Sequence, residues 1–333
     1  MSELLDPDRL AQWLDGRGLE RGRPLRAEPL AGGASNAMFV IERGASRWVL
    51  RRPAAVALER ADDGMRREFR FLSALDGTPV PHPPPVALCD DLDVLGCTFY
   101  LMGHVDGVIP RPAPPPFDDA QGRTDITYAL VDALASLHDV DPVASGIADL
   151  GRPEGFHERQ VKRWRGQLES YGGRELPGIE AVMQWLDANR PSAFTPSIMH
   201  GDYHMRNVLV ARTPPARVVA ILDWETATIG DPLLDLAGFC EVWTSSGDPD
   251  WPTRRQVIDR YREARGDGSI GDLRYYEVLY NFRLAVLLEG IYQRSLRDPS
   301  RTNGEMVGER VMFNVSRAVE LAGGSSNDRG ESG

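Results

Sequence analysis

The sequence predicts an α+β fold of two lobes, in which a small lobe with an antiparallel sheet and one helix precedes a larger, mainly helical lobe. Short β-prone runs dominate residues 25–100, whereas apolar residues recur at helical spacing from Ile126 onward. A stretch rich in glycine and proline, around residues 103–116, separates the two patterns. We therefore expect one lobe over residues 1–102, a second over 103–322, and a disordered polar tail over 323–333.

The elements of the first lobe follow from local signals. Asp6 and Pro7 are typical of an N-cap followed by the first helical residue, and predict a helix to about Leu14. The apolar runs 38–41 and 48–50 flank a glycine turn and predict a hairpin. A charged amphipathic segment over residues 59–75 predicts the helix of the lobe, and residues 98–102 predict a further strand.

Helical periodicity continues through the second lobe, over residues 126–137, 161–171, 233–243 and 275–296. Asp231 and Pro232 form a second N-cap and N1 pair before the third of these helices. Asp235 then lies in the first helical turn among apolar neighbours, where a carboxylate needs hydrogen-bond donors.

Composition excludes several classes of protein. The 333 residues carry a formal net charge of -11, which argues against nucleic acid as a main partner. The three cysteines have no disulfide or zinc spacing and are typical of a reducing compartment. The N-terminus lacks the basic and apolar parts of a signal peptide, and no apolar run is long enough to span a membrane. These features predict a cytoplasmic protein without a membrane partner, and leave its oligomeric state open.

The chemistry is concentrated in residues 200–207, which have the sequence HGDYHMRN, and in Asp223. The β-prone runs 208–210 and 218–222 predict a hairpin that brings Asn207 and Asp223 to the same end. Magnesium-assisted phosphoryl transfer needs one carboxylate that accepts the proton of the attacking hydroxyl and oxygen ligands that hold the cation. Asp202 fits the first role, and Asn207 with Asp223 fits the second.

Simpler interpretations exist for each residue alone. An aspartate after glycine is commonly a turn residue, and Asn207 and Asp223 could be a cap and an ordinary strand end. His200 and His204 could instead bind a transition metal together with Asp202, as in a metal-dependent hydrolase. That alternative leaves Asn207 unexplained.

The patterns HGDxHxxN, ILDWE and GDPLLDLA resemble the aminoglycoside phosphotransferase family, which has a protein-kinase-like fold. The branch that is most similar is the kinase-like domain fused to some acyl-CoA dehydrogenases. The resemblance covers about residues 25–318 and implies an ATP- and Mg²⁺-dependent kinase that phosphorylates a hydroxyl group of a small molecule. It also implies that His200, His204 and Asp235 support the catalytic loop structurally, and that Asp235 contacts His200 or backbone amides nearby.

The resemblance implies further residues at the nucleotide. It places the loop of Gly32, Gly33, Ser35 and Asn36 over the phosphates, where glycine permits close backbone approach. Arg51 stands where protein kinases normally have a lysine, and Glu68 matches the glutamate that holds this basic residue. Glu68 could also be a solvated helix charge. Residues 99–105, including Tyr100 and Met102, resemble the hinge that binds adenine. Because Arg51 departs from the kinase pattern, a nucleotide-binding pseudokinase is an alternative.

The acceptor side has one informative segment. Tyr280 and Arg283 lie on one stripe of the helix predicted at residues 275–296. An arginine among aromatic residues can bind a carboxylate or phosphate, although it could equally form an internal ion pair. We expect Arg283, Tyr280 and Glu225 to contact the acceptor, and a hydroxy acid or hydroxyacyl thioester to suit Arg283 better than an aminoglycoside does. The acidic excess of the second lobe would suit a cation instead.

Overall fold

The computed structural model describes residues 4–30, 36–54, 61–244, 251–266, 270–298 and 304–324. The chain divides into two compact units. The first contains residues 1–150, 205–227 and 250–252, and the second contains residues 151–204, 228–249 and 253–333. Gly32, Gly33 and Ser35, and residues 325–333 of the expected tail, lie outside the described residues. The lobe boundaries at residues 102 and 322 stay predictions.

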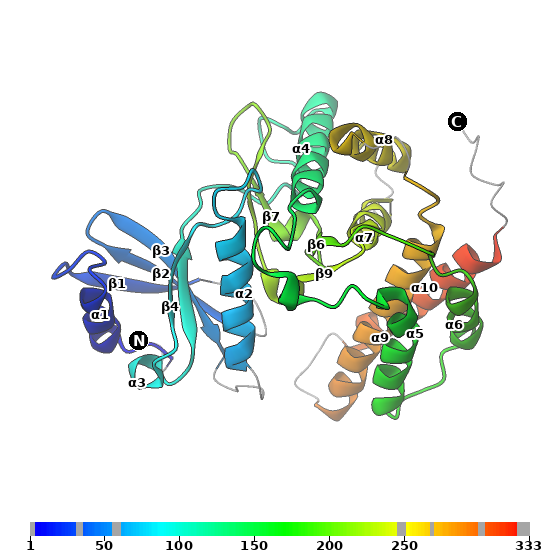
Figure 1. Cartoon of the computed structure of the whole chain (residues 1–333), viewed down its shortest axis with the longest axis horizontal. Coiled ribbons are helices and arrows are strands. Elements are labelled where there is room, and N and C mark those ends of the chain that lie inside the picture. Colours follow the sequence, from blue (N-terminus) through cyan, green and yellow to red (C-terminus); the bar gives the residue numbers. More distant parts are fainter. Residues whose placement is uncertain are drawn as a thin grey trace. The chain divides into compact units, whose positions relative to one another are not determined.

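The first unit is built on a five-stranded antiparallel sheet of order β1-β2-β3-β5-β4 (Figure 1). Its strands are β1 (Leu25–Leu30), β2 (Asn36–Arg43), β3 (Ser46–Pro53), β4 (Pro85–Cys89) and β5 (Phe99–Gly103). The predicted hairpin is confirmed as β2 and β3, and it turns at Gly44, whose φ of 58° suits glycine. The small antiparallel sheet of the predicted fold class is therefore present.

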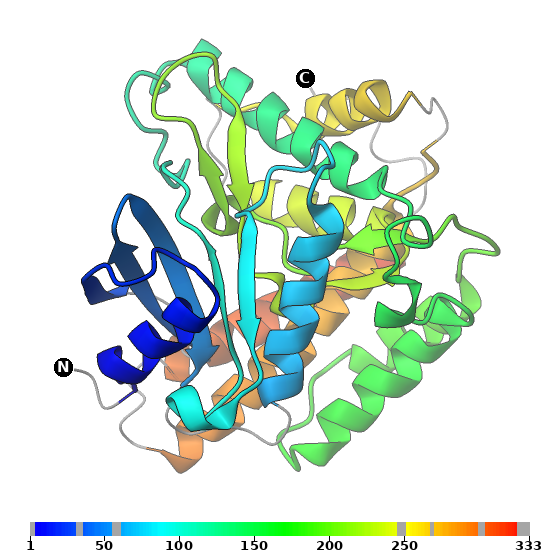
Figure 2. The ribbon, with the colours of Figure 1, turned by 60° about the vertical axis from the view of Figure 1, so that its left-hand side comes forward.

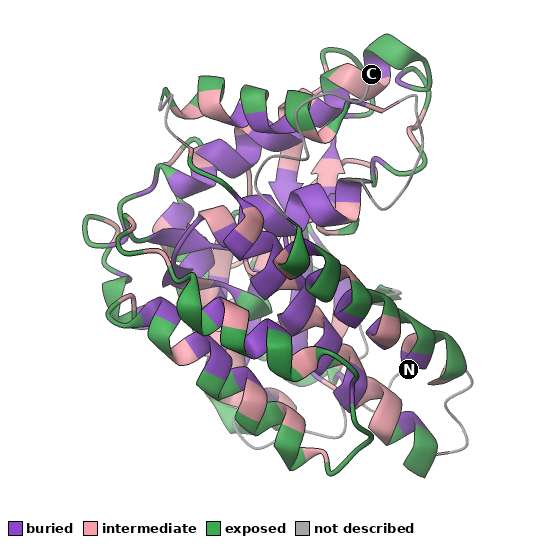
Figure 3. Ribbon diagram, turned by 90° about the vertical axis from the view of Figure 1, so that its right-hand side faces the viewer, coloured by how far each residue is buried: buried purple, intermediate pink, exposed green. Residues whose placement is uncertain are grey.

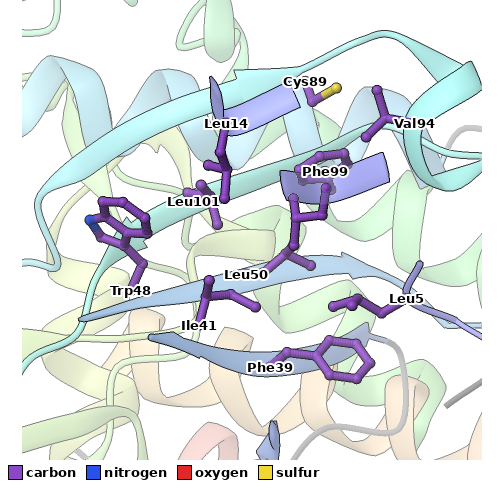
Figure 4. Close-up of a cluster of buried hydrophobic side chains, with 11 residues drawn as sticks. Leu5, Leu14, Phe39, Ile41, Trp48, Leu50, Cys89, Val94, Phe99 and Leu101 are labelled. Carbon is purple, nitrogen blue, oxygen red and sulfur yellow. The ribbon is translucent and has the colours of Figure 1, made fainter. Parts of the chain in front are cut away.

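Helices α1 (Pro7–Gly16) and α2 (Ala61–Leu75) cover opposite faces of this sheet (Figure 1). The Asp6 side chain caps α1 as predicted, accepting hydrogen bonds from the amides of Asp8 and Arg9. Leu14 of α1 packs into a core with Ile41, Leu50 and other buried side chains of the sheet and of α3 (Leu92–Leu95), shown in Figure 4. Because side chains alternate along a strand, the next residue of β3, Arg51, faces α2.

The remaining elements of the first unit come after the five-stranded sheet in the sequence. Helix α4 (Ala120–His138) packs on β8, and the 3₁₀ turn η1 (Ala148–Leu150) ends the segment. Strands β7 (Val208–Val210) and β8 (Val218–Ile221) form the second predicted hairpin, visible in Figure 2 as a yellow-green ribbon. The short turns η2 (Met205–Asn207) and η3 (Trp224–Thr226) flank it. This hairpin carries Asn207 and Asp223.

The second unit is mainly helical, as the sequence predicts. It contains α5 (Phe156–Ser170), α6 (Ile179–Ala188), α7 (Leu233–Thr244), α8 (Arg254–Arg265), α9 (Arg274–Arg297) and α10 (Gly304–Gly323), with a small ribbon of β6 (Ser197–Met199) and β9 (Thr228–Gly230). Helix α9 contacts α5, α6, α7 and α10 and forms the centre of the unit. Figure 3 shows its helices with buried inner and exposed outer faces. None of the helices in the described ranges is long and apolar enough to cross a membrane.

Candidate active site

The β7–β8 hairpin places Asn207 and Asp223 at the same end, as the sequence predicts. Val208 pairs with Ile221, and the next pair along the ribbon is closed by a hydrogen bond of 2.7 Å from the Leu222 amide to the Asn207 carbonyl. Asn207 therefore lies beside the residue that precedes Asp223. An amide oxygen and a carboxylate are hard donors that suit Mg²⁺, so the two side chains at this end could hold that ion.

The backbone at Asp223 is in the left-handed region, with φ 65° and ψ 70°. Among the described residues other than glycine, only Glu20 shares a positive φ. Aspartate tolerates this conformation better than most residues, and such backbone outliers concentrate at functional sites. The conformation turns the chain sharply out of β8 and presents the Asp223 carboxylate, which is 36% exposed, toward Arg51.

Arg51 lies between two carboxylates within the first unit. Its Nε is 2.8 Å from Glu68 Oε2, and its Nη2 donates a hydrogen bond of 2.8 Å to Asp223 Oδ1. Glu68 and Arg51 are both buried, so Glu68 is not a solvated helix charge. The neighbouring arginine, Arg52, faces the other side of the sheet and donates to the carbonyl oxygens of Leu4 and Leu95. Because side chains alternate along the strand, Arg51 and not Arg52 contacts Glu68 and Asp223.

Burial and neighbouring charges shift the pKa values of Arg51 and Glu68. Burial opposes the charged form of Arg51, but the Glu68 and Asp223 carboxylates together hold its pKa above the usual value. Burial raises the pKa of Glu68 to about 7, although Arg51 and a hydrogen bond from Tyr100 lower it. The Tyr100 hydroxyl donates that bond to Glu68 Oε2 at 2.9 Å. The Tyr100 side chain thus contacts the Arg51–Glu68 pair. The similarity of residues 99–105 to a kinase hinge did not predict this contact.

The remaining nucleotide-side residues are placed as follows. Met102 lies on β5 opposite Val49 of β3, within the ladder that forms the expected hinge segment. Asn36 donates a hydrogen bond of 3.3 Å to Glu225 Oε2, whose carboxylate is also 3.6 Å from Arg51 Nη2. Glu225, which the sequence assigns to the acceptor, thus contacts Asn36 and Arg51.

In the second unit, Asp235 shapes the loop before Asp202. Its carboxylate accepts hydrogen bonds from the His200 amide at 2.5 Å and from the Gly201 amide at 2.9 Å, which are the contacts that the sequence predicts. Gly201 has a φ of 81°, a conformation that favours glycine. The Asp202 amide then donates to Nδ1 of the fully buried His200 at 3.3 Å. These bonds define the backbone on which Asp202 stands.

Asp202 lines a small recess of about 10 Å³. The other lining residues come from the same loop and from α7 and α9, namely Gly201, Tyr203, Leu234, Asp235, Gly238, Tyr280 and Arg283. His204 Nε2 lies 3.4 Å from Asp202 Oδ1. No group of three or more histidine, cysteine or acidic side chains in the described part of the chain is arranged to hold a metal ion.

Arg283 is the basic residue that lines this recess together with Asp202. Its guanidinium lies over the ring of Trp164, 5.3 Å from the centroid, and it forms no hydrogen bond or ion pair with any residue that the structure describes. Burial lowers its pKa, and the nearby Asp235 and Asp202 carboxylates oppose this shift. The internal ion pair that the sequence left open is therefore not found within the described ranges.

Comparison with known families decides the class of this site. A family model described as "Phosphotransferase enzyme family" matches residues 26–275. The chain belongs to this phosphotransferase family. The match extends from the sheet that carries Arg51 to the start of α9, and thus includes the Asp202 loop and the hairpin with Asn207 and Asp223.

Individual relatives agree with this assignment. Human acyl-CoA dehydrogenase family member 11 is 31% identical over 301 residues, which are 86% of this chain and 38% of that protein. The chain therefore spans about two fifths of the length of this relative. A crystal structure from Ralstonia eutropha JMP134, assigned to the aminoglycoside phosphotransferases, has a TM-score of 0.84 and 29% identity, covering 95% of this chain and 98% of the other. The protein-kinase-like fold of the phosphotransferase is thus established.

More distant solved structures share the fold. An aminoglycoside phosphotransferase in ternary complex with AMP-PNP and hygromycin B has a TM-score of 0.56 at 15% identity, covering 95% of this phosphotransferase and 99% of the other chain.

Several contacts of the site were not predicted from the sequence, including the Tyr100–Glu68 hydrogen bond and a buried network around Asp231. In that network, Asp231 Oδ2 accepts from the Tyr276 hydroxyl at 2.8 Å and lies 2.9 Å from His157 Nε2. No spacing in the sequence links these three residues.

Proposed function

We propose that this phosphotransferase is an ATP- and Mg²⁺-dependent kinase that phosphorylates a hydroxyl group of a small anionic molecule. The observation that supports this acceptor class is the position of Arg283, whose charge lies in the recess beside Asp202. No carboxylate of the described residues forms an ion pair with it. An aminoglycoside, which is a polycation, would be repelled by Arg283. A hydroxy acid or hydroxyacyl thioester would present oxygen atoms to it.

The first unit supplies the residues for the nucleotide. Arg51, fixed by Glu68, would bind phosphate oxygens with donors that a guanidinium offers in a planar fork. Asn207 and Asp223 would hold the magnesium ion, whose charge stabilises the phosphoryl group as it transfers. The loop of Gly32, Gly33, Ser35 and Asn36 and the hinge with Tyr100 and Met102 remain our proposal for phosphate and adenine contacts.

The second unit supplies the residues for the acceptor. Asp202 would accept the proton of the acceptor hydroxyl while that oxygen forms its bond to the γ-phosphorus and the bond from phosphorus to the ADP oxygen breaks. Asp235 fixes the loop backbone, so Asp202 needs little reorganisation. Arg283 and Tyr280 would orient the acceptor. The chain joins the two sets directly, since only five positions separate Asp202 from Asn207.

The relatives support the thioester as one form of the acceptor. The human relative is named as an acyl-CoA dehydrogenase family member, and this chain matches 38% of its length. An enzyme that acts on acyl thioesters and carries a kinase-like region would be served by a kinase for hydroxylated acyl groups. The proposal that this chain acts on such groups rests on that name together with Arg283.

Substitution of Asp202 by asparagine tests the reaction. A panel of hydroxy acids and their thioesters is incubated with ATP and Mg²⁺, and ADP release is measured for the wild type and the Asp202→Asn variant. We expect the variant to lose at least about 100-fold in kcat, the contribution typical of a general base, while its Kd for ATP changes little. Full activity in the variant would exclude the mechanism. Nucleotide binding without ADP release from any acceptor, in the wild type, would indicate the pseudokinase.

A further inference from the structure

A second, larger cavity lies next to the Asp202 recess within the second unit. It has a volume of about 330 Å³, against about 10 Å³ for the recess. A volume of about 10–15 Å³ accommodates one water molecule, so the recess admits a single small group such as the reacting hydroxyl. The larger cavity has the size of ordinary ligand sites, which begin at about 300 Å³. The body of an acceptor therefore needs space outside the recess, and the larger cavity is adjacent to it.

Among the residues that the structure describes, Tyr280 is the one side chain that lines both spaces. Its ring lies against α7 at Gly238, where an added Cβ would be 2.6 Å from Tyr280 Cε2. Only glycine at position 238 leaves room for this ring position. The Tyr280 hydroxyl forms no hydrogen bond with the residues that the structure describes. Burial and the nearby Asp202 carboxylate raise the pKa of Tyr280 to about 12, so the phenol keeps its proton and can donate it to a ligand.

The charged residues of the larger cavity differ in their pairing. Arg317 is bound to Glu241 at 3.1 and 3.2 Å and to Glu320 at 3.1 Å. Arg310 has no such partner among the described residues, and its guanidinium instead lies 4.6 Å from the ring centroid of Phe313. The carboxylates of the cavity are thus engaged, whereas the donors of Arg310 are available. An anionic group is the ligand that such an arginine binds best.

The lining of the larger cavity includes apolar side chains as well as charged and amide side chains. Leu284 of α9 and Phe313 of α10 line the cavity, and α9 and α10 pack along each other. Exposed apolar side chains continue both helix faces, with Leu287 one turn after Leu284 and Met306 one turn before Arg310. Such a surface suits an aliphatic chain that lies along the two helices.

We propose that the acceptor extends past Tyr280 into this cavity, where its chain packs on Leu284 and Phe313 and an anionic group at its far end binds Arg310. Tyr280, kept in place by Gly238, then separates the reacting end from the body and selects elongated acceptors. This inference rests on the proposed function for its reacting end. It names the substrate as a molecule whose reacting end presents its hydroxyl oxygen to Asp202 and Arg283 and whose far end carries an anion, joined by an aliphatic spacer.

Two isomeric probes test the position of the anion. In 8-hydroxyoctanoate the carboxylate is remote from the terminal hydroxyl, whereas in 2-hydroxyoctanoate the two groups are adjacent. Isothermal calorimetry gives the Kd of each, and ADP release gives kcat/KM. We expect the wild type to favour the 8-hydroxy isomer, and Arg310→Gln to lower this preference about ten-fold, as the loss of one charge-assisted contact implies. Arg294→Gln, which removes an exposed arginine from α9, serves as the matched control.

The ratio of the values measured for the 8-hydroxy and 2-hydroxy isomers decides whether the inference holds. An unchanged ratio in Arg310→Gln, or no binding of either isomer to the wild type at millimolar concentration, would overturn the inference. Binding that depends on Arg310 without any ADP release would leave the inference standing and would contradict the proposed function instead. The two proposals can therefore fail separately.

Variants of Gly238 and Tyr280 test whether the Tyr280 ring separates the recess from the larger cavity. Gly238→Ala displaces the Tyr280 ring, and we expect the ratio of the two isomers to change by at least about ten-fold. Tyr280→Phe keeps the ring and should retain the preference for the 8-hydroxy isomer, whereas Tyr280→Ala removes the ring between the two spaces and should abolish this preference. Equal ratios in Tyr280→Phe and Tyr280→Ala would contradict the role of the ring. Circular dichroism and urea unfolding of each variant verify that it is folded.

Discussion

Arg51 of β3 donates a hydrogen bond of 2.8 Å to Asp223, the carboxylate that follows β8. The same guanidinium contacts Glu68 through a different nitrogen. A lysine would offer a single nitrogen on a flexible stem in place of the two guanidinium nitrogens that make these contacts. The arginine therefore joins α2 to the hairpin end within one unit, which gives the departure from the kinase pattern a structural role.

Substitution of Arg51 should separate its structural and nucleotide roles. Arg51→Lys keeps the charge but loses one carboxylate contact, and we expect the KM for ATP to rise about ten-fold. Arg51→Gln leaves buried Glu68 without its cation and should cost about 3 kcal/mol in the free energy of unfolding. Urea titration and ADP release measure the two effects. Arg47→Gln on the same strand, whose ion pair with Glu42 is exposed, should change neither.

The raised pKa of Glu68 predicts a pH dependence of stability. Its pKa is about 7 in the folded protein against an ordinary value of 4.5. The folded state thus binds this proton more tightly, so the contribution to stability is present below pH 4.5 and is lost as the pH rises through about 7. Between these values, wild type should lose up to about 1.4 kcal/mol per pH unit relative to Glu68→Gln. Urea unfolding of both proteins at pH 5, 6 and 7 measures the difference, which would stay constant if Glu68 were ionised throughout.

Asp235 should affect turnover through the backbone of the Asp202 loop. Asp235→Asn replaces one of two acceptor oxygens by an amide nitrogen, which faces a backbone N–H and cannot accept from it. We expect a loss of about 1–3 kcal/mol in unfolding free energy and a lower kcat, with an unchanged Kd for ATP. Asp272→Asn, where an exposed carboxylate accepts from the Arg274 amide, is the control. A kcat as high as that of the control would show that the loop does not depend on Asp235.

Substitution by alanine at two glycines should change the stability of the protein in opposite directions. A Cβ at Gly230 would lie 2.5 Å from Phe156 Cε2 and 2.7 Å from Met199 Sδ, so Gly230→Ala should destabilise the protein by about 1–3 kcal/mol. Gly166 lies inside α5 with nothing within 4 Å of such an atom. Gly166→Ala should stabilise the protein by about 0.5–1 kcal/mol. Thermal unfolding of both variants measures these effects, and equal shifts would contradict the packing at Gly230.

Much of the fold could be predicted because its signals are local. The Asp6 cap, the β2–β3 and β7–β8 hairpins, and helices such as α9 follow from turn residues and apolar spacing within a few positions of each other. The convergence of Asn207 and Asp223 belongs to the same class, since a hairpin brings together residues that are near in the chain. The loop Ala31–Ser35 lies outside the described residues, and its phosphate role stays a prediction.

The sequence by itself determined the lobes' secondary structure and the family pattern around Asp202, because periodicity and short spacings encode both. Only the tertiary structure decided which distant side chains meet. It paired Arg51 with Glu68, directed the Tyr100 hydroxyl to that pair, and set Glu225 beside Asn36. It also left Arg283 and Arg310 without described carboxylate partners on either side of Tyr280. Helical spacing shows which face a residue occupies, but the charges that reach it come from packing of segments far apart in the chain.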